Sequence, residues 1–321
     1  MTPSPRLPSW LAPAPPAVAI EIAHRRVTVA ELSVDATGPL VASYASQPLS
    51  PEAVVPAPAG VNVPDAALVA GAVRRAVEEA GMRMPRRVAL LVPDSIARVS
   101  LLNFEQLPAR AADLDQLVRW QLRKATPFPI EEARIVHTLA HATADGSSIV
   151  ATVARHDVIA QYEAVTAALG MQAGIVDLAG FNVMNAVMAA GNSPVGDALL
   201  VCLAHEGTTL AILRGRSLMF YRHRPAVDEE PLGTLVHQTA MYHEDRLGGS
   251  RFARVWLCGA ALAGGGADRA RRELGDLLGV AAEMVDIRPA AALRDRISPR
   301  PDVLDALAAP VGVLLRERKA A

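Results

Sequence analysis

The sequence predicts a duplicated α/β fold in which two similar halves enclose a cleft. The first support is an internal repeat, because "IAHRRVTVAEL" (residues 22–32) returns 181 positions later as "LAHEGTTLAIL" (residues 203–213). The second is a shared context, in which two apolar runs flank a polar turn and lead into a third strand and then helices. A single repeat per half excludes a short-period solenoid and favours two packed halves. The identical pairs are Ala23/Ala204, His24/His205, Thr28/Thr209, Ala30/Ala211 and Leu32/Leu213.

The first half of the chain predicts strands and helices in turn. Residues 65–81 form a predicted helix, with Asp65 as the N-cap and Gly81 as the stop. Residues 86–94 and 97–104 predict a hairpin that turns at Asp94 and Ser95. The other strands are expected at 17–23, 27–34, 38–49, 133–143, 147–155 and 172–180, and the other helices at 113–126, 156–170 and 181–191.

The pattern then restarts in the second half. A glycine loop, "AALAGGG" (residues 260–266), lies between a predicted strand and a predicted helix. The last helix, expected at 301–318, contains Pro310, at which a bend is expected. The remaining strands are expected at 197–204, 208–215, 217–224, 253–259 and 281–287, and the remaining helices at 231–249 and 267–279.

Composition narrows the class of protein. The 321 residues suffice for two domains, and 51% of them are hydrophobic, which allows a substantial core. A formal net charge of −1 gives no support for a nucleic-acid or anionic-membrane surface. The two cysteines lie in apolar runs, which indicates a reducing compartment and no disulfide framework. Residues 1–16 form a Pro-rich tail without a signal-peptide core, and no apolar run long enough to span a membrane is present.

Taken together, these stretches resemble the type IV pilus assembly protein PilM family, actin-like relatives of the cell-division protein FtsA. The most specific stretch is "VALLVPDSIARVSLLNFEQLP" with the following "DQLVRWQLRKATPFPIEEA", which resembles the family's inserted subdomain. The resemblance covers essentially the whole chain after the tail. It implies a duplicated actin-like (RNase H-like) ATPase fold. The expected parts are a tail at 1–16, a first core domain at 17–84 and 150–194, an inserted subdomain at 85–149, and a second core domain at 195–321 with a helical subdomain near 226–250.

The resemblance also locates the nucleotide site and shows where it is altered. The family's phosphate hairpins have the forms Asp-Ile-Gly-Ser and Asp-Ile-Gly-Ala, whereas this chain has "EIAH" (residues 21–24) and "CLAH" (residues 202–205). The acid of such a turn holds hydrated Mg²⁺, and the glycine lets the backbone approach phosphate without a Cβ atom. Loss of one acid and both glycines removes the metal clamp and crowds the phosphate site.

We therefore expect no catalytic residues, no metal site and at most weak binding of ATP or ADP with Mg²⁺. His24 and His205 are either phosphate contacts or ordinary polar turn residues. His137 and His141 lie in a predicted strand, so their spacing lacks the helical geometry of a zinc motif. The nucleotide-site candidates are Glu21, His24, His205, Thr208, Gly259, Gly264, Gly265 and Gly266.

A partner surface is expected on the inserted subdomain. The resemblance implies that the N-terminal cytoplasmic peptide of a PilN-like inner-membrane protein docks between the first core domain and this subdomain. Trp120 beside two arginines is typical of an interface hot spot, although an amphipathic helix with a partly buried Trp explains it as well. The partner-site candidates are Leu107, Trp120, Arg123 and Phe128.

The resemblance favours a cytoplasmic adaptor, peripheral at the inner face of the inner membrane, that contacts other pilus assembly proteins, binds no nucleic acid and does not insert directly into the membrane. The first alternative is an active actin-like ATPase or a sugar-kinase-type phosphotransferase, which the altered hairpins disfavour. The second is the cytoplasmic module of a type II secretion protein, which the lack of a following transmembrane helix disfavours.

Overall fold

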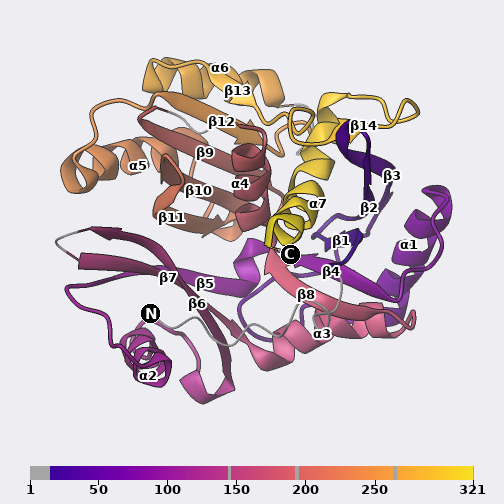
Figure 1. Cartoon of the computed structure of the whole chain (residues 1–321), viewed down its shortest axis with the longest axis horizontal. Helices are drawn as coiled ribbons and strands as arrows, with labels where there is room; N and C mark the ends of the chain where they lie inside the picture. Colours follow the sequence, from indigo (N-terminus) through magenta and orange to yellow (C-terminus); the bar gives the residue numbers. More distant parts are fainter. Residues whose placement is uncertain (1–14, 144–145, 192–194, 263–265, 321) are drawn as a thin grey trace.

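The computed structural model describes residues 15–143, 146–191, 195–262 and 266–320. Within these ranges the chain forms three β-sheets, with helices packed between and outside them (Figure 1). Each large sheet belongs mainly to one half of the chain, and the small sheet belongs to the inserted subdomain. No helix of the described ranges is long and apolar enough to cross a membrane.

The first large sheet has the strand order β14-β3-β2-β1-β4-β8. Its apolar strands are buried because α1 and α3 cover one face and α4 and α7 the other. The elements of the first half are β1 (Val18–Ile22), β2 (Arg26–Asp35), β3 (Gly38–Pro48), α1 (Ala66–Glu79), β4 (Arg87–Val92), α3 (His156–Ala167), β8 (Gln172–Leu178) and α4 (Ala179–Ala189).

The second large sheet has the strand order β11-β10-β9-β12-β13. Its outer face packs against α5 and α6. The elements of this half are β9 (Asp197–Ala204), β10 (Gly207–Arg214), β11 (Ser217–Pro225), η3 (Ala226–Asp228), α5 (Leu232–Leu247), β12 (Arg254–Cys258), α6 (Ala267–Leu278), β13 (Ala282–Met284), β14 (Ala292–Leu293) and α7 (Pro301–Ala320).

The two large sheets confirm the duplication. In both halves a three-stranded antiparallel unit is extended by two parallel strands in the same spatial order, with β14 added only to the first sheet. The irregularities match as well, because a register shift between Glu31 and Leu32 has its counterpart between Ile212 and Leu213. These positions are also 181 residues apart, and the extra residues, Ala42 of β3 and Met219 of β11, place a bulge in the third strand of each unit.

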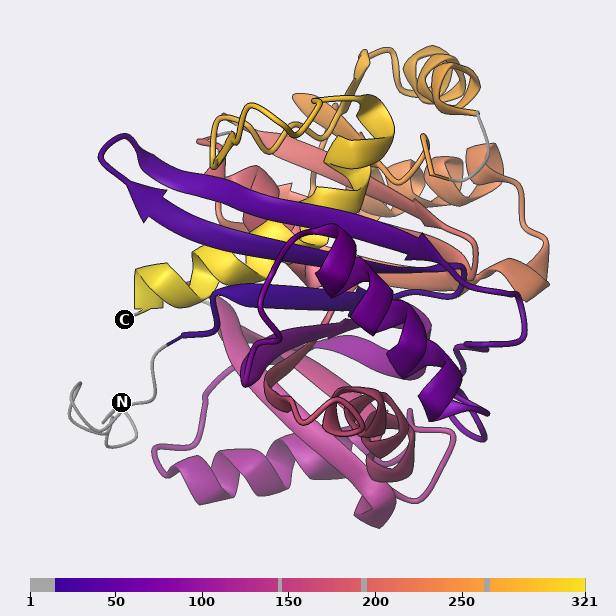
Figure 2. The same cartoon turned by 90° about the vertical axis from the view of Figure 1, so that its right-hand side faces the viewer.

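Helices α4 and α7 lie side by side between the two large sheets (Figure 1). Figure 2 shows the long β2–β3 hairpin lying across α7, which also contacts β1 and β4. The last helix of the second half therefore packs on the first sheet. It is helical from Pro301 to Ala320, with Pro310 inside the helix.

The inserted subdomain is a sheet with the order β5-β7-β6 and a helix, α2, on one face. Side chains alternate along β7, so that Ile149, Ala151 and Val153 pack against α2 while their neighbours face the core domains. The elements are η1 (Asp94–Ile96), β5 (Ala97–Phe104), α2 (Ala111–Leu122), η2 (Ile130–Glu132), β6 (Ala133–Thr143) and β7 (Gly146–Arg155).

The structure corrects the prediction of a hairpin turning at Asp94 and Ser95. Strand β4 is a central parallel strand of the first sheet, whereas β5 pairs only with β7 in the small sheet. Sheet membership consequently places the inserted subdomain at about residues 94–155, not at the expected 85–149. The two apolar runs resemble a hairpin locally, but β4 is fully buried between layers of helices, as a central parallel strand requires.

Candidate functional site

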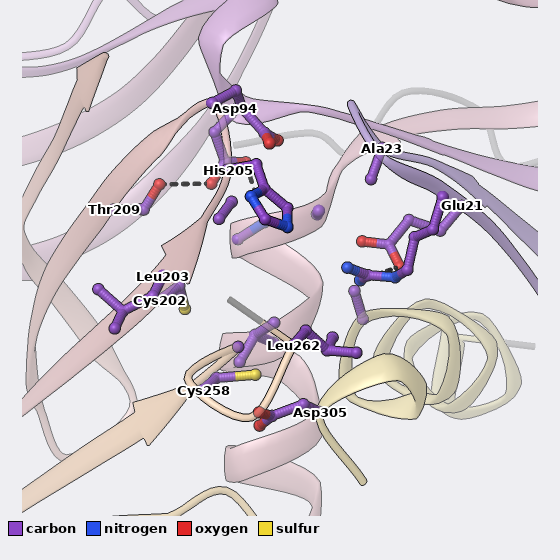
Figure 3. A pocket seen from close by; sticks show the side chains of 18 of the residues that line it. Glu21, Ala23, Asp94, Cys202, Leu203, His205, Thr209, Cys258, Leu262 and Asp305 are labelled. Carbon is purple, nitrogen blue, oxygen red and sulfur yellow. Dashed lines mark hydrogen bonds and ion pairs between the residues drawn. The ribbon is translucent and has the colours of Figure 1, made fainter. Parts of the chain in front are cut away.

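The predicted cleft lies where the β1–β2 turn of one half meets the β9–β10 turn of the other (Figure 3). Its cavity has a volume of only about 70 Å³. Pockets for small-molecule ligands are typically about 300–1,000 Å³, so a nucleotide does not fit this closed arrangement. Carboxylate side chains of Glu21, Asp94, Glu206 and Asp305 line the cavity.

An arginine of the first hairpin neutralises the acid at the expected Mg²⁺ position. The buried Glu21 carboxylate accepts a hydrogen bond from Arg26 at 2.9 Å. Arg26 also donates to the Thr28 hydroxyl at 3.2 Å, which fixes the guanidinium inside the cleft. A carboxylate held by its own hairpin in this way is a poor ligand for a divalent cation.

The two predicted histidines have different environments. His24 lies 2.6 Å, through Nδ1, from the carbonyl oxygen of Val54 and does not line the cavity. His205 lines the cavity, and burial together with the positive charges of Arg25, His24 and Arg26 lowers its pKa. It is therefore neutral at pH 7 and adds no positive charge for a phosphate group.

The second hairpin places further acidic and polar groups in the cleft. Burial, followed by the nearby carboxylates of Asp94 and Glu21, raises the pKa of Glu206 to about 7, although Arg26 opposes this shift. Thr209 lines the cavity, and the predicted Thr208 does not, because successive side chains of a strand point to opposite faces.

Asp94 connects the two halves across the cleft, a role that the sequence analysis missed. Its Oδ1 accepts from the backbone N–H of Gly180 at 2.9 Å, and its Oδ2 accepts from the Thr209 hydroxyl at 2.6 Å. A side chain at Gly180 would place Cβ 2.3 Å from Oδ2, so glycine is required for this approach. Gly180 opens α4 and Thr209 lies on β10, so one carboxylate joins both core domains.

The predicted adenosine loop is occupied by contacts within the protein. Gly259 has φ +81°, and a Cβ there would lie 1.9 Å from the Leu203 carbonyl oxygen, so packing against β9 explains this glycine. The backbone N–H of Ala261 donates to Asp305 of α7 at 2.9 Å. Gly264 and Gly265 lie outside the described residues, and Gly266 is the N-cap of α6.

The two cysteines lie on the floor of the same cleft. Cys202 on β9 is directly opposite Cys258 on β12 in the parallel register. A hydrogen bond with the Cys202 thiol and burial raise the pKa of Cys258, so it remains a protonated, unreactive thiol at neutral pH.

Together these contacts do not fit Mg²⁺ and a triphosphate. Both turns carry Cβ atoms at the glycine positions, and the second turn has a thiol in place of the acid. The cavity presents several carboxylates to a ligand that is itself an anion, and Arg26 is already paired with Glu21. No cluster of three or more metal-ligating side chains is found in the described ranges.

A larger groove lies between the inserted subdomain and the core. It consists of two neighbouring cavities, of about 350 and 460 Å³, that share Val136, Thr152 and Asp177 as wall residues. On one side is β6, an edge strand of the small sheet, and on the other is β8, an edge strand of the first sheet. Val136 and Leu139 of β6 are apolar but 62% and 40% exposed, so the groove offers unburied apolar surface.

The four predicted partner residues lie on the other side of the small sheet. Trp120 is 67% exposed, which agrees with a partly buried side chain and leaves most of it accessible, and Arg123 pairs with Glu131 at 3.2 Å. Leu107 and Phe128 pack against the small hydrophobic core beneath α2. None of these four residues lines the groove. Val136 lines it, but was not among the predicted partner residues.

The chain therefore has a duplicated actin-like ATPase fold with an altered phosphate site and an inserted three-stranded subdomain. The family model described as type IV pilus assembly protein PilM matches residues 19–229, and the chain belongs to this family. The match runs from β1 to the turn after β11 and includes the whole inserted subdomain. No curated protein matches the chain in sequence.

The chain is also similar to solved structures, and one of them shows the same fold. The chain is similar to a structure described as the PilM–PilN type IV pilus biogenesis complex, at 18% identity and a TM-score of 0.79, covering 95% of this chain and 99% of that one. The cytoplasmic domain of EpsL, an inner membrane component of the type II secretion system of Vibrio cholerae, is 9% identical with a TM-score of 0.49, covering 95% and 94%. The ethanolamine utilization protein EutJ from Carboxydothermus hydrogenoformans is 13% identical with a TM-score of 0.48, covering 95% and 90%.

Proposed function

We propose that the chain is an adaptor of a type IV pilus, or of a related secretion machine, that binds the cytoplasmic peptide of a PilN-like membrane protein. The groove between β6 and β8 is the observation that carries this proposal. A neighbouring fold is described in complex with PilN, and the groove has the features that an extended peptide requires.

Two edge strands and an apolar wall suit such a peptide. The outer edges of β6 and β8 offer main-chain hydrogen bonds, and pockets between them take alternate side chains. The ion pair between Arg316 of α7 and Asp177 of β8 lies at the junction of the two cavities. The last helix of the second half therefore contributes to the same groove. Residues of both halves would then form the docking site.

The adaptor would be held at the cytoplasmic face of the inner membrane by this peptide. The chain is proposed to insert no helix of its own and to contact other pilus assembly proteins through its remaining surface. Trp120 and Arg123 on α2 are exposed and lie on the far side of the small sheet, where a second partner could be bound without blocking the groove.

We predict that Val136→Asp weakens binding of the PilN-like peptide by at least roughly thirtyfold, the loss that corresponds to a hot spot of ~2 kcal/mol. The new carboxylate would stand in the apolar wall shared by both cavities. Because Val136 is 62% exposed, the melting temperature should hardly change. The measurement is calorimetric titration with a synthetic peptide that has the cytoplasmic N-terminal sequence of the PilN-like protein from the same organism.

Trp120→Ala is the matched control for this experiment, because Trp120 is as exposed as Val136 but lies on α2. We expect it to leave peptide affinity unchanged. If Trp120→Ala weakens binding and Val136→Asp does not, the groove is not the docking site and the α2 surface takes its place.

We also propose that the adaptor hydrolyses no ATP, because the groups that would bind Mg²⁺ and adenosine in the cleft are already paired within the protein. Arg26 holds Glu21, and Asp305 holds the backbone of the loop that would bind adenosine. Purified protein should show no Mg²⁺-dependent turnover, and millimolar ATP should not raise its melting temperature. Steady turnover that disappears in Glu21→Ala would contradict this proposal.

A further inference from the structure

A second pocket, of about 400 Å³, lies between two other strand edges on the described part of the chain. One wall is β5, an edge strand of the small sheet, and the opposite wall is β11, an edge strand of the second large sheet. Pro58 and Phe128, from two loops of the first half, complete the walls with apolar rings. The pocket is separate from the β6–β8 groove and has only Ala97 in common with it.

The pocket is strongly cationic. Arg98, Arg222 and Arg224 line it, and no carboxylate does so in the described ranges. Arg98 is exposed, and among the described residues it has neither a hydrogen bond nor an ion pair. Arg222 donates to the neutral amide of Gln238 at 3.2 Å. Burial and the adjacent positive charge of Arg224 lower the pKa of Arg222, and the Glu230 carboxylate opposes this shift only in part.

Buried polar atoms in the same walls lack hydrogen-bond partners among the described residues. They include the Ser95 hydroxyl and Nε of Arg224, whose nearest carboxylate, on Glu230, is 3.7 Å away. An unpaired buried donor costs about 1–3 kcal/mol, so a ligand that pairs with it gains affinity. Both atoms are buried, and Arg224 also forms an ion pair with Glu230, so a ligand reaches them only after these side chains rotate.

His223 closes the inner side of the pocket and is fixed by contacts within the protein. The Thr209 hydroxyl donates to Asp94 and lies 2.9 Å from Nδ1 of His223, so Nδ1 carries the proton and donates to Thr209. Burial lowers the pKa of His223, so its ring is neutral and Nε2 is an acceptor. Nε2 is buried and has no partner in the described residues. A Cβ atom added at Gly207 would lie 2.9 Å from Nε2, so this atom faces Gly207 and is closed to a ligand in the pocket.

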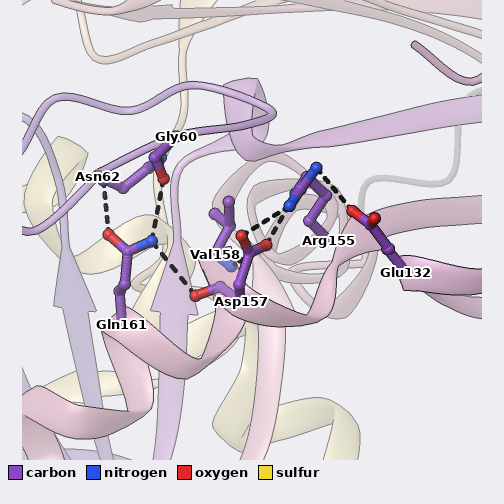
Figure 4. A network of polar contacts seen from close by, with 7 residues as sticks. All are labelled: Gly60, Asn62, Glu132, Arg155, Asp157, Val158 and Gln161. Atoms are coloured by element: carbon purple, nitrogen blue, oxygen red, sulfur yellow. Dashed lines mark hydrogen bonds and ion pairs between the residues drawn. The ribbon is translucent and has the colours of Figure 1, made fainter. Parts of the chain in front are cut away.

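Polar contacts beside the pocket hold the segments that carry two of its apolar wall residues (Figure 4). The Gln161 side chain accepts from the backbone N–H of Asn62 at 2.6 Å and donates to the carbonyl oxygen of Gly60 at 3.0 Å, which holds the loop that carries Pro58. Arg155 pairs with Glu132 and Asp157, each at 2.8 Å, and its guanidinium lies 5.6 Å from the centre of the Phe128 ring. Pre-organised walls reduce the entropy that binding would otherwise lose.

We propose that this pocket binds an extended acidic peptide segment of a partner protein. Its carboxylates pair with Arg98, Arg222 and Arg224, its backbone follows the edges of β5 and β11, and its apolar atoms pack on Pro58 and Phe128. A small inorganic anion would satisfy the arginines but would leave the apolar walls and the strand edges unused. The site is independent of the peptide groove proposed above.

Fluorescence anisotropy with a labelled hexaglutamate peptide and the full chain tests the proposal. Loss of one charged hydrogen bond should weaken binding at least roughly tenfold, so we expect this loss for both Arg98→Gln and Arg222→Gln. Arg74→Gln, on the exposed face of α1, is the charge-matched control and should leave affinity within about twofold. Val136→Asp should also leave hexaglutamate binding unchanged, because it affects the other groove.

Two results would overturn the proposal. One is equal affinity in Arg98→Gln, Arg74→Gln and the unmodified chain, since Arg98 is exposed and its replacement does not threaten folding. The other is tighter binding of inorganic pyrophosphate than of hexaglutamate, which would make the pocket a site for small oxyanions. Melting temperatures of all variants, measured in parallel, identify any loss of affinity that arises from unfolding.

Discussion

Replacement of Gly312 by alanine is expected to lower the free energy of unfolding by about 2–3 kcal/mol, near the upper end for overpacked positions. Gly312 lies on α7, where the helix meets α4 between the two large sheets. A Cβ atom there would lie 1.7 Å from the carbonyl oxygen of Asn182 and 3.0 Å from the backbone nitrogen of Ala186. Both are backbone atoms, so the two helices must move apart, and the higher helix propensity of alanine, worth ~1 kcal/mol, offsets only part of the cost.

Gly275→Ala is the matched control, because Gly275 lies in the middle of α6 and the nearest atom to its added Cβ is 3.9 Å away. This substitution should be neutral or should stabilise the protein by up to ~1 kcal/mol through helix propensity alone. Urea unfolding of both variants measures the difference. Equal stability of the two variants would mean that the α4–α7 contact adapts to the extra atom and does not fix the distance between the halves.

The duplication was predictable because short sequence patterns, which repeat in the two halves of the chain, indicate it. Polar turns between alternating apolar runs are visible in the sequence, and the repeat of residues 22–32 at 203–213 is reflected in matching register shifts, between β2 and β3 and between β10 and β11. Helix boundaries follow from short-range signals such as Asp65, which accepts hydrogen bonds from Ala67 and Leu68. The β4–β5 hairpin was wrong because pairing of two neighbouring strands depends on which layers cover them, and no local signal reports this.

The cleft was predictable only in part. The missing acid and glycines of the two turns indicated an altered phosphate site, since those residue types are tied to positions in a short motif. The groups that fill the site come from distant segments, and Asp94, Glu206 and Asp305 meet there only after the halves are assembled. The exposure of Trp120 likewise depends on which face of α2 packs on the small sheet, and the flanking arginines do not decide it.

Removal of the Asp94 carboxylate is expected to cost about 2–4 kcal/mol in Asp94→Ala. Two buried donors, the backbone N–H of Gly180 and the hydroxyl of Thr209, would each lose a charged acceptor. Asp35→Ala is the matched control, since Asp35 also accepts from backbone N–H groups, those of Thr37 and Gly38, and from a threonine hydroxyl, that of Thr37, but in an exposed turn. Water can replace its carboxylate, so the loss there should not exceed about 1 kcal/mol.

The conservative variant Asp94→Asn separates the two bonds. Its amide oxygen can still accept from Gly180, but its –NH₂ group cannot accept from the Thr209 hydroxyl, so the loss should be intermediate. Because Gly180 belongs to the first half and Thr209 to the second, the order of the three stabilities reports how much of the contact between the halves depends on this one side chain. Hydrogen exchange at the Gly180 amide should accelerate in Asp94→Ala and stay slow in Asp94→Asn. If exchange stays slow in both variants and Asp94→Ala is no less stable than Asp35→Ala, the helices α4 and α7 hold the halves together without Asp94.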